Sequence, residues 1–426
     1  MSWMIFFVFL ALVFYLTVKK GFFNMKERQL LFVLLLFKIA GGLTFYSIYV
    51  WHYKQGDSLE YYNEAKVLAE VLHKDFNTGL EIYFQKPGEC TATSSYWTDQ
   101  LLSRHYYDAD SFFIIKMIGL LVFIGVSSYL VLTLIGVLFS YLLMFYALLL
   151  LKQAERNLSV ELVILCLIIP TVLVWSNGLG KDNIVYALSL YLMIAGYVKL
   201  LGFPINGFNA FIIILSSVFL YSLKPLFLCI ILLVFIWAFI FNKLSTRSSP
   251  LFNTLLLFPS AILVLSIGAF AGIYFNEKYV FEMIERAYDW NQFSDQGSAF
   301  NYGALEYDTL KLVKLSAYSF ITALFRPFIW ESNTMPTFLQ ALENLMLLIA
   351  GAFVLIKTPI IKLIFSFCNK PAYWFLFMSG VVILIGVGLG TYNFGLLSRF
   401  RIVGVSGILF SFLFLLHEQS SKYRTI

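Results

Sequence analysis

Long apolar runs recur along the whole chain, and they constrain its fold more than any other feature. A helix needs about 20 apolar residues to cross the hydrocarbon core of a bilayer. We identify eleven such crossings, near residues 2–18, 30–52, 127–151, 158–175, 183–201, 207–223, 225–242, 251–275, 337–356, 372–391 and 401–417. The sequence therefore predicts an all-α, polytopic membrane helical bundle, organised by the bilayer as one transmembrane domain over 1–426.

The composition agrees with this class. Of the 426 residues, 60% are hydrophobic and only 13% are charged, whereas soluble domains are about 45–50% apolar and about 25% charged. This balance excludes an ordinary soluble enzyme, a disordered chain, a collagen and a disulfide scaffold. The four cysteines and four histidines are scattered, and the histidines show no metal-ligand spacing.

Two further apolar stretches, 111–126 and 312–329, are shorter or broken. We interpret both as re-entrant or interfacial helices that close two outer loops, at about 54–126 and 276–329. Within the first loop, segment 57–74 has apolar residues at helical spacing. It is therefore expected to form an amphipathic helix on the outer membrane surface.

The distribution of basic residues predicts the orientation. With the C-terminus inside, the inside segments carry 14 basic residues against four acidic ones. Cytoplasmic loops of membrane proteins are enriched in Lys and Arg. Eleven crossings then place the N-terminus outside.

Polar motifs collect at the predicted outer ends of the helices, and ionisable residues at a membrane edge suggest functional sites. Asp57, in Gly56-Asp57-Ser58, could act as a general base towards a hydroxyl acceptor, with Tyr61 close by in sequence. The alternative is that this motif only caps the following helix.

The turn Trp175–Asn183 contains two glycines, Lys181 and Asp182. Backbone N–H groups at the start of the next helix, together with Lys181, would suit a phosphate. The alternative is a glycine hairpin with Asp182 as a cap and a lysine that snorkels. Lys224, before Pro225 at another outer turn, could also bind phosphate, and the alternative is that it only snorkels.

The segment Leu324–Asn333 holds Arg326, Glu331 and Asn333 in a broken, aromatic helix. Arg326 could bind phosphate oxygens, or it could form an internal salt bridge with Glu331. Glu343 lies within the apolar region 337–356 and needs a partner, for which an outer basic residue is favoured.

Asn393, Arg399 and Arg401 precede the last crossing. Arginines at an outer entrance suggest a diphosphate, or more simply an acidic outer loop. We expect the basic residues of all these motifs to share one face with candidate carboxylates: Lys181, Lys224, Arg326, Arg399 and Arg401, with Asp57, Asp182 and Glu331. Most predicted crossings have no polar residue at their centre, which favours surface chemistry over transport.

The chain resembles a family of bacterial polytopic envelope proteins, similar in layout to the GT-C glycosyltransferases and to the polymerases of O-antigen and exopolysaccharides. The resemblance covers about residues 29–417. Its motifs are Gly56-Asp57-x-x-x-Tyr61, Pro170 with Trp175-Ser176, Gly180-Lys181-Asp182, Lys224-Pro225, Arg326-Pro327-Phe328-x-Trp330-Glu331, Leu342-Glu343-Asn344 and Asn393-x-Gly395-x-x-x-Arg399-x-Arg401. In GT-C enzymes an Asp of the first outer loop is a base or a metal-associated carboxylate, and basic residues hold the polyprenyl phosphate.

The resemblance implies a glycosyltransferase or polysaccharide polymerase of the bacterial inner membrane. Its substrate would be a polyprenyl-linked sugar or glycan at the extracytoplasmic face, and its partners membrane lipid but no nucleic acid. Asp57 and Glu331 would be catalytic, the five basic residues would bind the lipid phosphate, and the supporting residues would be Tyr61, Asp182, Asn333, Glu343 and Asn393. The sequence shows no metal ligands, although the resemblance leaves a divalent metal open. The alternatives are a lipid-linked glycan flippase and a non-catalytic subunit of an envelope assembly.

Overall fold

The structure is a computed structural model that describes residues 1–19, 23–89, 104–155, 157–245, 285, 289, 298–300, 309–368 and 370–424. Of these residues 84% are helical, and they contain no β-strand. The all-α prediction is therefore confirmed. The predicted crossing at 251–275 lies outside the described residues, as does most of the loop that begins at 276.

The chain forms two compact units. Unit 1 comprises Met1–Ile168, Val172–Leu192 and Ile205–Leu228, and unit 2 comprises Ile169–Thr171, Met193–Pro204 and Cys229–Ile426. Three helices contribute residues to both units: α10 (Pro170–Trp175), α11 (Lys181–Leu200) and α13 (Pro225–Ser245).

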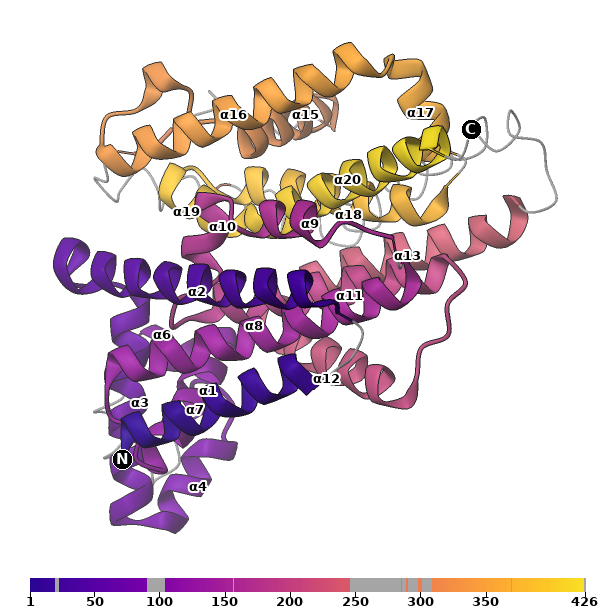
Figure 1. The fold of residues 1–426 in the computed structure, drawn as a ribbon. Coiled ribbons are helices and arrows are strands. Elements are labelled where there is room, and N and C mark those ends of the chain that lie inside the picture. The colour runs from indigo at the N-terminus through magenta and orange to yellow at the C-terminus, as the bar shows by residue number, and fades with distance from the viewer. Residues whose placement is uncertain are drawn as a thin grey trace. The chain divides into compact units, whose positions relative to one another are not determined.

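Nine further α-helices and one π-helix in the described part of the chain belong to unit 1 alone (Figure 1). They are α1 (Ser2–Lys19), α2 (Met25–Ser47) with its π-helical continuation η1 (Ile48–Tyr53), α3 (Asp57–Lys74), α4 (Phe76–Phe84), α6 (Arg104–Tyr107), α7 (Ala109–Phe123), α8 (Tyr129–Ala154), α9 (Val160–Leu167) and α12 (Gly207–Leu223). Helix α2 packs along α8, and α3 packs along α7. Gly42 allows the contact of α2 with α8, because a Cβ atom there would lie 2.5 Å from the Val137 side chain. Gly41 lies against α10 instead, where a Cβ atom would overlap the backbone oxygen of Leu173.

The remaining elements of unit 2 form a second bundle. They are α15 (Thr309–Phe325), η2 (Ile329–Glu331), α16 (Met335–Lys357), α17 (Ile360–Cys368), α18 (Pro371–Gly390), α19 (Phe394–Phe400) and α20 (Ile402–Arg424). Helix α18 packs against both α20 and α15. The contact of α18 with α20 is close because small residues face each other: a Cβ atom on Gly380 would lie 2.6 Å from the oxygen of Gly404.

Six helices in the described part of the chain are long and apolar enough to cross a membrane: Met25–Tyr53, Tyr129–Ala154, Lys181–Leu200, Pro225–Lys243, Met335–Ile356 and Pro371–Gly390. A seventh is a bent pair, Phe394–Phe400 with Ile402–His417, which turns by 51°. Ser2–Val18 and Gly207–Leu223 are apolar but shorter. These helices support the membrane-protein class, and the number of crossings stays a prediction.

Several predicted boundaries change in the structure. The expected crossing 158–175 is two helices, α9 and α10, because the chain leaves the helix at Ile168 and restarts at Pro170, a residue suited to a first turn. The two short stretches appear as α7, of 15 residues, and α15, of 17 residues. The amphipathic helix predicted over 57–74 is confirmed as α3, and it buries one face that includes Tyr61, Ala65 and Leu68.

Candidate functional site

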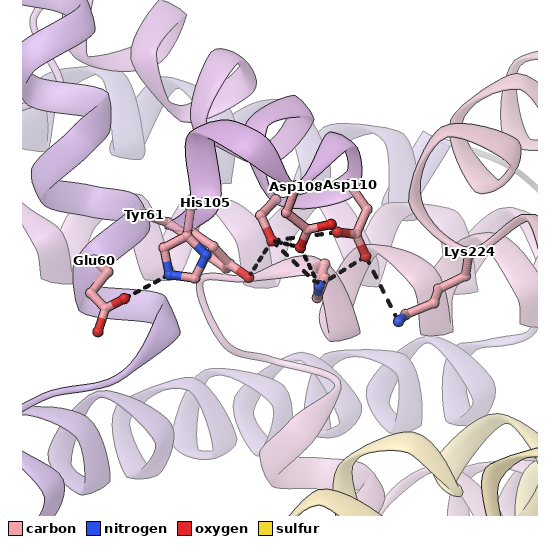
Figure 2. A network of polar contacts seen from close by, with 8 residues as sticks. Glu60, Tyr61, His105, Asp108, Asp110 and Lys224 are labelled. Atoms are coloured by element: carbon pink, nitrogen blue, oxygen red, sulfur yellow. Dashed lines mark hydrogen bonds and ion pairs between the residues drawn. The ribbon is translucent and has the colours of Figure 1, made fainter. Parts of the chain in front are cut away.

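A charged cluster lies where several helices of unit 1 begin. Asp110 stands in the first turn of α7, Lys181 is the first residue of α11, and Lys224 directly precedes α13. The Lys181 Nζ atom donates a hydrogen bond of 2.8 Å to Asp110 Oδ2, and the Lys224 Nζ atom lies 3.7 Å from the same oxygen. One carboxylate therefore joins three helix starts (Figure 2).

Two hydroxyl groups extend the cluster towards α3. Ser111 donates a hydrogen bond of 2.7 Å to Asp108 Oδ2, and the Tyr61 hydroxyl lies 3.2 Å from Ser111 Oγ. Lys181 Nζ also lies 3.9 Å from Asp108 Oδ2. Figure 2 shows the contacts of Tyr61 with the aspartate cluster and Lys224, and beside them the contact of Glu60 with His105.

Helix electrostatics explain why acids gather here. The first turns carry Asp57 and Glu60 in α3, Asp110 in α7 and Asp182 in α11. The N-terminal end of a helix has a partial positive charge that stabilises a carboxylate. Since several helices start at the same end of unit 1, their acids are brought together, and the lysines balance them.

The two aspartates of α7 have opposite pKa shifts. Burial opposes ionisation of Asp110, but the hydrogen bond with Asp108 and the charge of Lys181 outweigh it and lower the pKa of Asp110 to about 2. Burial and the hydrogen bond with Asp110 raise the pKa of Asp108 above its usual value. A pair of carboxyl groups with separated pKa values can divide the roles of fixed charge and proton carrier.

The pKa values of two polar groups around the aspartates are shifted as well. Burial raises the pKa of Tyr61 to about 12, so its hydroxyl keeps its proton near neutral pH. Burial and the nearby Lys181 lower the pKa of Lys224. The Asp108 side chain is 54% exposed, whereas that of Lys181 is 12% exposed. Asp108 is therefore the more solvent-exposed member of this pair.

A second group adjoins this cluster at the start of α3. Asp57, Glu60 and His105 each place one potential ligand atom within 4.8 Å of the others. His105 Nε2 lies 2.6 Å from Glu60 Oε2. No metal-ligand spacing is visible for the histidines in the sequence, because His105 lies 45 residues from Glu60 and reaches it only through the fold.

In unit 2, Arg326 and Glu331 form an ion pair. The Arg326 Nη2 atom donates a hydrogen bond of 2.6 Å to Glu331 Oε1, and Nε donates another of 2.9 Å to the same oxygen. The backbone N–H of Phe328 donates to Glu331 Oε2, and the guanidinium lies over the rings of Phe300 and Phe394. The structure thus forms the internal salt bridge, and a phosphate at Arg326 would have to compete with Glu331.

Arg401 is fully buried and pairs with Glu343. Its Nη2 atom lies 3.1 Å from Glu343 Oε1, and Thr171 donates both its backbone N–H and its hydroxyl to the same carboxylate. The prediction that Glu343 pairs with a basic residue is confirmed. Arg401, a candidate phosphate ligand at the outer entrance of the last crossing, has a side chain that is 0% exposed and is occupied by Glu343.

The other predicted residues of unit 2 are spread over it. Asn393 caps α19 by accepting hydrogen bonds from the backbone of Gly395 and Leu396. Arg399 lies beside the Phe400 ring, and Asn333 is exposed between η2 and α16. These positions are consistent with structural roles.

Unit 1 thus brings together five of the predicted residues: Asp57, Tyr61, Lys181, Asp182 and Lys224. The other seven lie in unit 2: Arg326, Glu331, Asn333, Glu343, Asn393, Arg399 and Arg401. One shared face for all of them stays a prediction.

Sequence reasoning missed Asp108, Asp110, Ser111, Glu60 and His105 as site residues. One signal was available: Asp108-Ala109-Asp110-Ser111 directly precedes the apolar stretch 111–126. That is the same placement of acids before a helix that marked Asp57.

Comparison with known proteins adds no relative. No protein-family model, curated protein or solved structure matches the chain. What the site can do follows from its own residues and contacts, and the resemblance to GT-C enzymes stays an expectation.

Proposed function

We propose that this protein is a membrane glycosyltransferase or polysaccharide polymerase. It uses a polyprenyl-phosphate-linked sugar at the extracytoplasmic face of the bacterial cytoplasmic membrane. The observation that carries the proposal is the cluster of Asp108, Asp110, Lys181 and Lys224: Asp110 contacts both ammonium groups, and Asp108 lies 3.9 Å from that of Lys181.

Glycosyl transfer needs both kinds of group. The oxygen of an acceptor hydroxyl forms a bond to the anomeric carbon of the sugar, and the bond from that carbon to the phosphate oxygen breaks. The hydroxyl proton goes to a base, and the lipid phosphate leaves with the bonding electrons. A general base works best when its pKa is near the working pH, which favours Asp108 over Asp110.

The lysines suit the leaving phosphate. The Lys224 side chain is 31% exposed and lies directly before α13, so it is more accessible to a phosphate than Lys181, whose side chain is 12% exposed. Lys181 is held by Asp110 and orients the cluster. Placed donors of this kind act where negative charge develops, and losing one typically lowers the rate by about a hundredfold or more.

The test is complementation of a gene deletion in the native bacterium. Wild type, Asp108→Asn, Lys224→Gln and the control Glu70→Gln would be compared at matched membrane levels. Glu70 lies on α3 but is exposed and pairs with Lys74, away from the cluster. Surface glycan is measured on gels, and lipid-linked intermediates by mass spectrometry.

The proposal expects the two cluster variants to lose one glycan and to accumulate its lipid-linked precursor in the outer leaflet, with the control like wild type. Glycans that do not change when the gene is removed would contradict it. So would cluster variants that match wild type.

A lipid-linked glycan flippase is the second candidate, because α2 carries a buried lysine in its middle. Lys38 is 1% exposed, and its Nζ atom lies 3.4 Å from the oxygen of Ser176. Ionisable residues within a membrane helix often mark a substrate path. In the same experiment a flippase would leave the precursor in the inner leaflet, and Lys38→Met would be the more damaging variant.

A further inference from the structure

Three side chains of metal-ligating type converge at the start of α3. Asp57 and Glu60 are three residues apart on this helix, so they lie on the same face. His105, from α6, is buried, and its ring stands edge-on to that of Tyr61 at 4.8 Å between centroids. The packing fixes the imidazole, while the two carboxylates belong to partly exposed residues that can adjust.

The spacing is close to that of a metal centre. The three ligand atoms lie within 4.8 Å of one another. Ligand atoms bound at about 2.1 Å from a metal stand roughly 3 to 4 Å apart. His105 Nε2 is hydrogen-bonded to Glu60 Oε2 at 2.6 Å, so these two atoms would separate, and Asp57 would move towards them, to hold a metal ion.

We propose that Asp57, Glu60 and His105 bind one divalent metal ion of the manganese and zinc class. Imidazole nitrogen favours zinc and other transition metals, whereas carboxylate oxygen also accepts manganese and magnesium. Three protein ligands leave coordination positions open, as in catalytic rather than structural sites.

The neighbouring residues indicate what would fill the open positions. Tyr61 contacts His105 with its ring and Ser111 with its hydroxyl, so it links the three ligands to the aspartates and lysines of the cluster. A metal there would bind a phosphate oxygen of the lipid-linked sugar. This role rests on the proposed function, whereas the metal site itself does not.

The test is Mn²⁺ binding by the full-length protein, purified in detergent and stripped with a chelator. Electron paramagnetic resonance measures free Mn²⁺ during a titration, and Zn²⁺ is then added as a competitor. The variants are His105→Gln, Glu60→Gln and Asp57→Asn. The controls are His73→Gln and Glu70→Gln, which change exposed residues of the same types on α3. Size-exclusion profiles and unfolding midpoints show which variants are folded.

The site predicts one saturable Mn²⁺ equivalent in wild type and in both controls, displaced by Zn²⁺. The ligand variants should bind at least about tenfold more weakly. If His105→Gln does not fold, the Mn²⁺ affinity of Asp57→Asn becomes the decisive measurement. Asp57 is partly exposed, so this substitution should disturb the fold less.

Absence of a saturable site in wild type, or unchanged affinity in the folded ligand variants, would overturn the inference. The readout does not depend on transferase activity. Metal binding without any glycan phenotype would therefore keep the metal site and reject the proposed function.

Discussion

Asp108 and Asp110 are two residues apart in the sequence, and their pKa values shift in opposite directions. Asp110 sits between the two lysines, so its negative charge is stabilised. Asp108 is more exposed, lies farther from Lys181 and shares a hydrogen bond with its neighbour. The fixed charge of one residue thus prepares the other to exchange protons.

The low pKa of Asp110 predicts acid sensitivity. Its folded pKa is about 2, and its unfolded value is about 3.9. Between these values the unfolded chain binds a proton that the folded chain does not, so stability falls as the pH falls through this window. At pH values above this window, we expect ionised Asp110 to contribute roughly 1 kcal/mol to the free energy of unfolding. The contribution is small because solvent screens a partly exposed group.

Unfolding by a denaturing detergent, measured from neutral pH down to this window, checks the acid effect. Asp110→Asn should be less stable than wild type at neutral pH, and its stability should depend less on pH. An identical pH profile for both proteins would contradict the assignment.

The buried pair of Arg401 and Glu343 gives a larger effect. Arg401→Met leaves a carboxylate buried without its cation, and Glu343→Met leaves the guanidinium without its anion, so each should cost about 3–5 kcal/mol. The double variant should cost less than the sum, because no charge is then left unpaired.

Unfolding titrations of the two single variants and the double variant form a double-mutant cycle. Glu70→Gln is the control, since its pair with Lys74 is exposed and contributes little. Single variants as stable as this control would show that the pair does not stabilise the fold.

At the residue scale, the sequence indicated contacts between groups that are close in the chain or few in kind. The Arg326–Glu331 salt bridge was one of two alternatives, and an ion pair of Glu343 was the favoured interpretation. Arg326 and Glu331 are five residues apart, and Glu343, as an acid in an apolar region, needed a cation. The ligand group at His105 was not predictable in this way. Its members come from separate segments, and no spacing rule connects Glu60 to a histidine in α6.

At the scale of elements, the spacing of apolar residues predicted helix bounds correctly where one face of a helix is buried and the other exposed. Helix α3 has the bounds expected from its apolar spacing. Breaks inside apolar stretches were harder to predict, because hydropathy does not change across them. The turn between α9 and α10 comes directly before Pro170. The 51° bend between α19 and α20 lies at Arg401, which forms a buried ion pair with Glu343.

Close helix contacts predict which glycines resist substitution. Gly41→Ala should destabilise unit 1 by roughly 1–3 kcal/mol, because the new methyl group would overlap the backbone of Leu173. Gly388→Ala should do the same in unit 2, where the nearest atom is the backbone oxygen of Ser319 at 2.4 Å.

The matched control is Gly351→Ala, in α16, where a Cβ atom would meet nothing within 4 Å. It should be neutral or slightly stabilising, because Ala has the higher helix propensity. Unfolding titrations of the three variants make the comparison. Equal stability for all three would show that the glycines are not required for packing.

At the scale of the whole molecule, the distribution of basic residues predicts the orientation of the chain. A fluorescent protein fused to the C-terminus should fluoresce, because that end is expected in the cytoplasm. A periplasm-active phosphatase fused after Asn206, between α11 and α12, should be inactive, and one fused after Ser222 should be active. The reverse pattern would reject the predicted topology.

The number of crossings could not be predicted from apolar runs alone. α12 is an example: it has 17 residues and is apolar throughout, yet it is shorter than the helices that meet the length of a span. Hydropathy shows that the side chains of a segment favour an apolar environment. It does not distinguish a crossing from a helix buried in protein.

The distance along the chain between the members of the charged cluster has a consequence for biosynthesis. Asp110 and Lys181 are 71 residues apart, which at about 5–20 residues per second corresponds to roughly 4–14 s of translation. During that interval Asp108 and Asp110 have been synthesised and Lys181 has not. The contact of Asp110 with Lys181 therefore cannot form before the start of α11 has been synthesised. The contact with Lys224 follows later still.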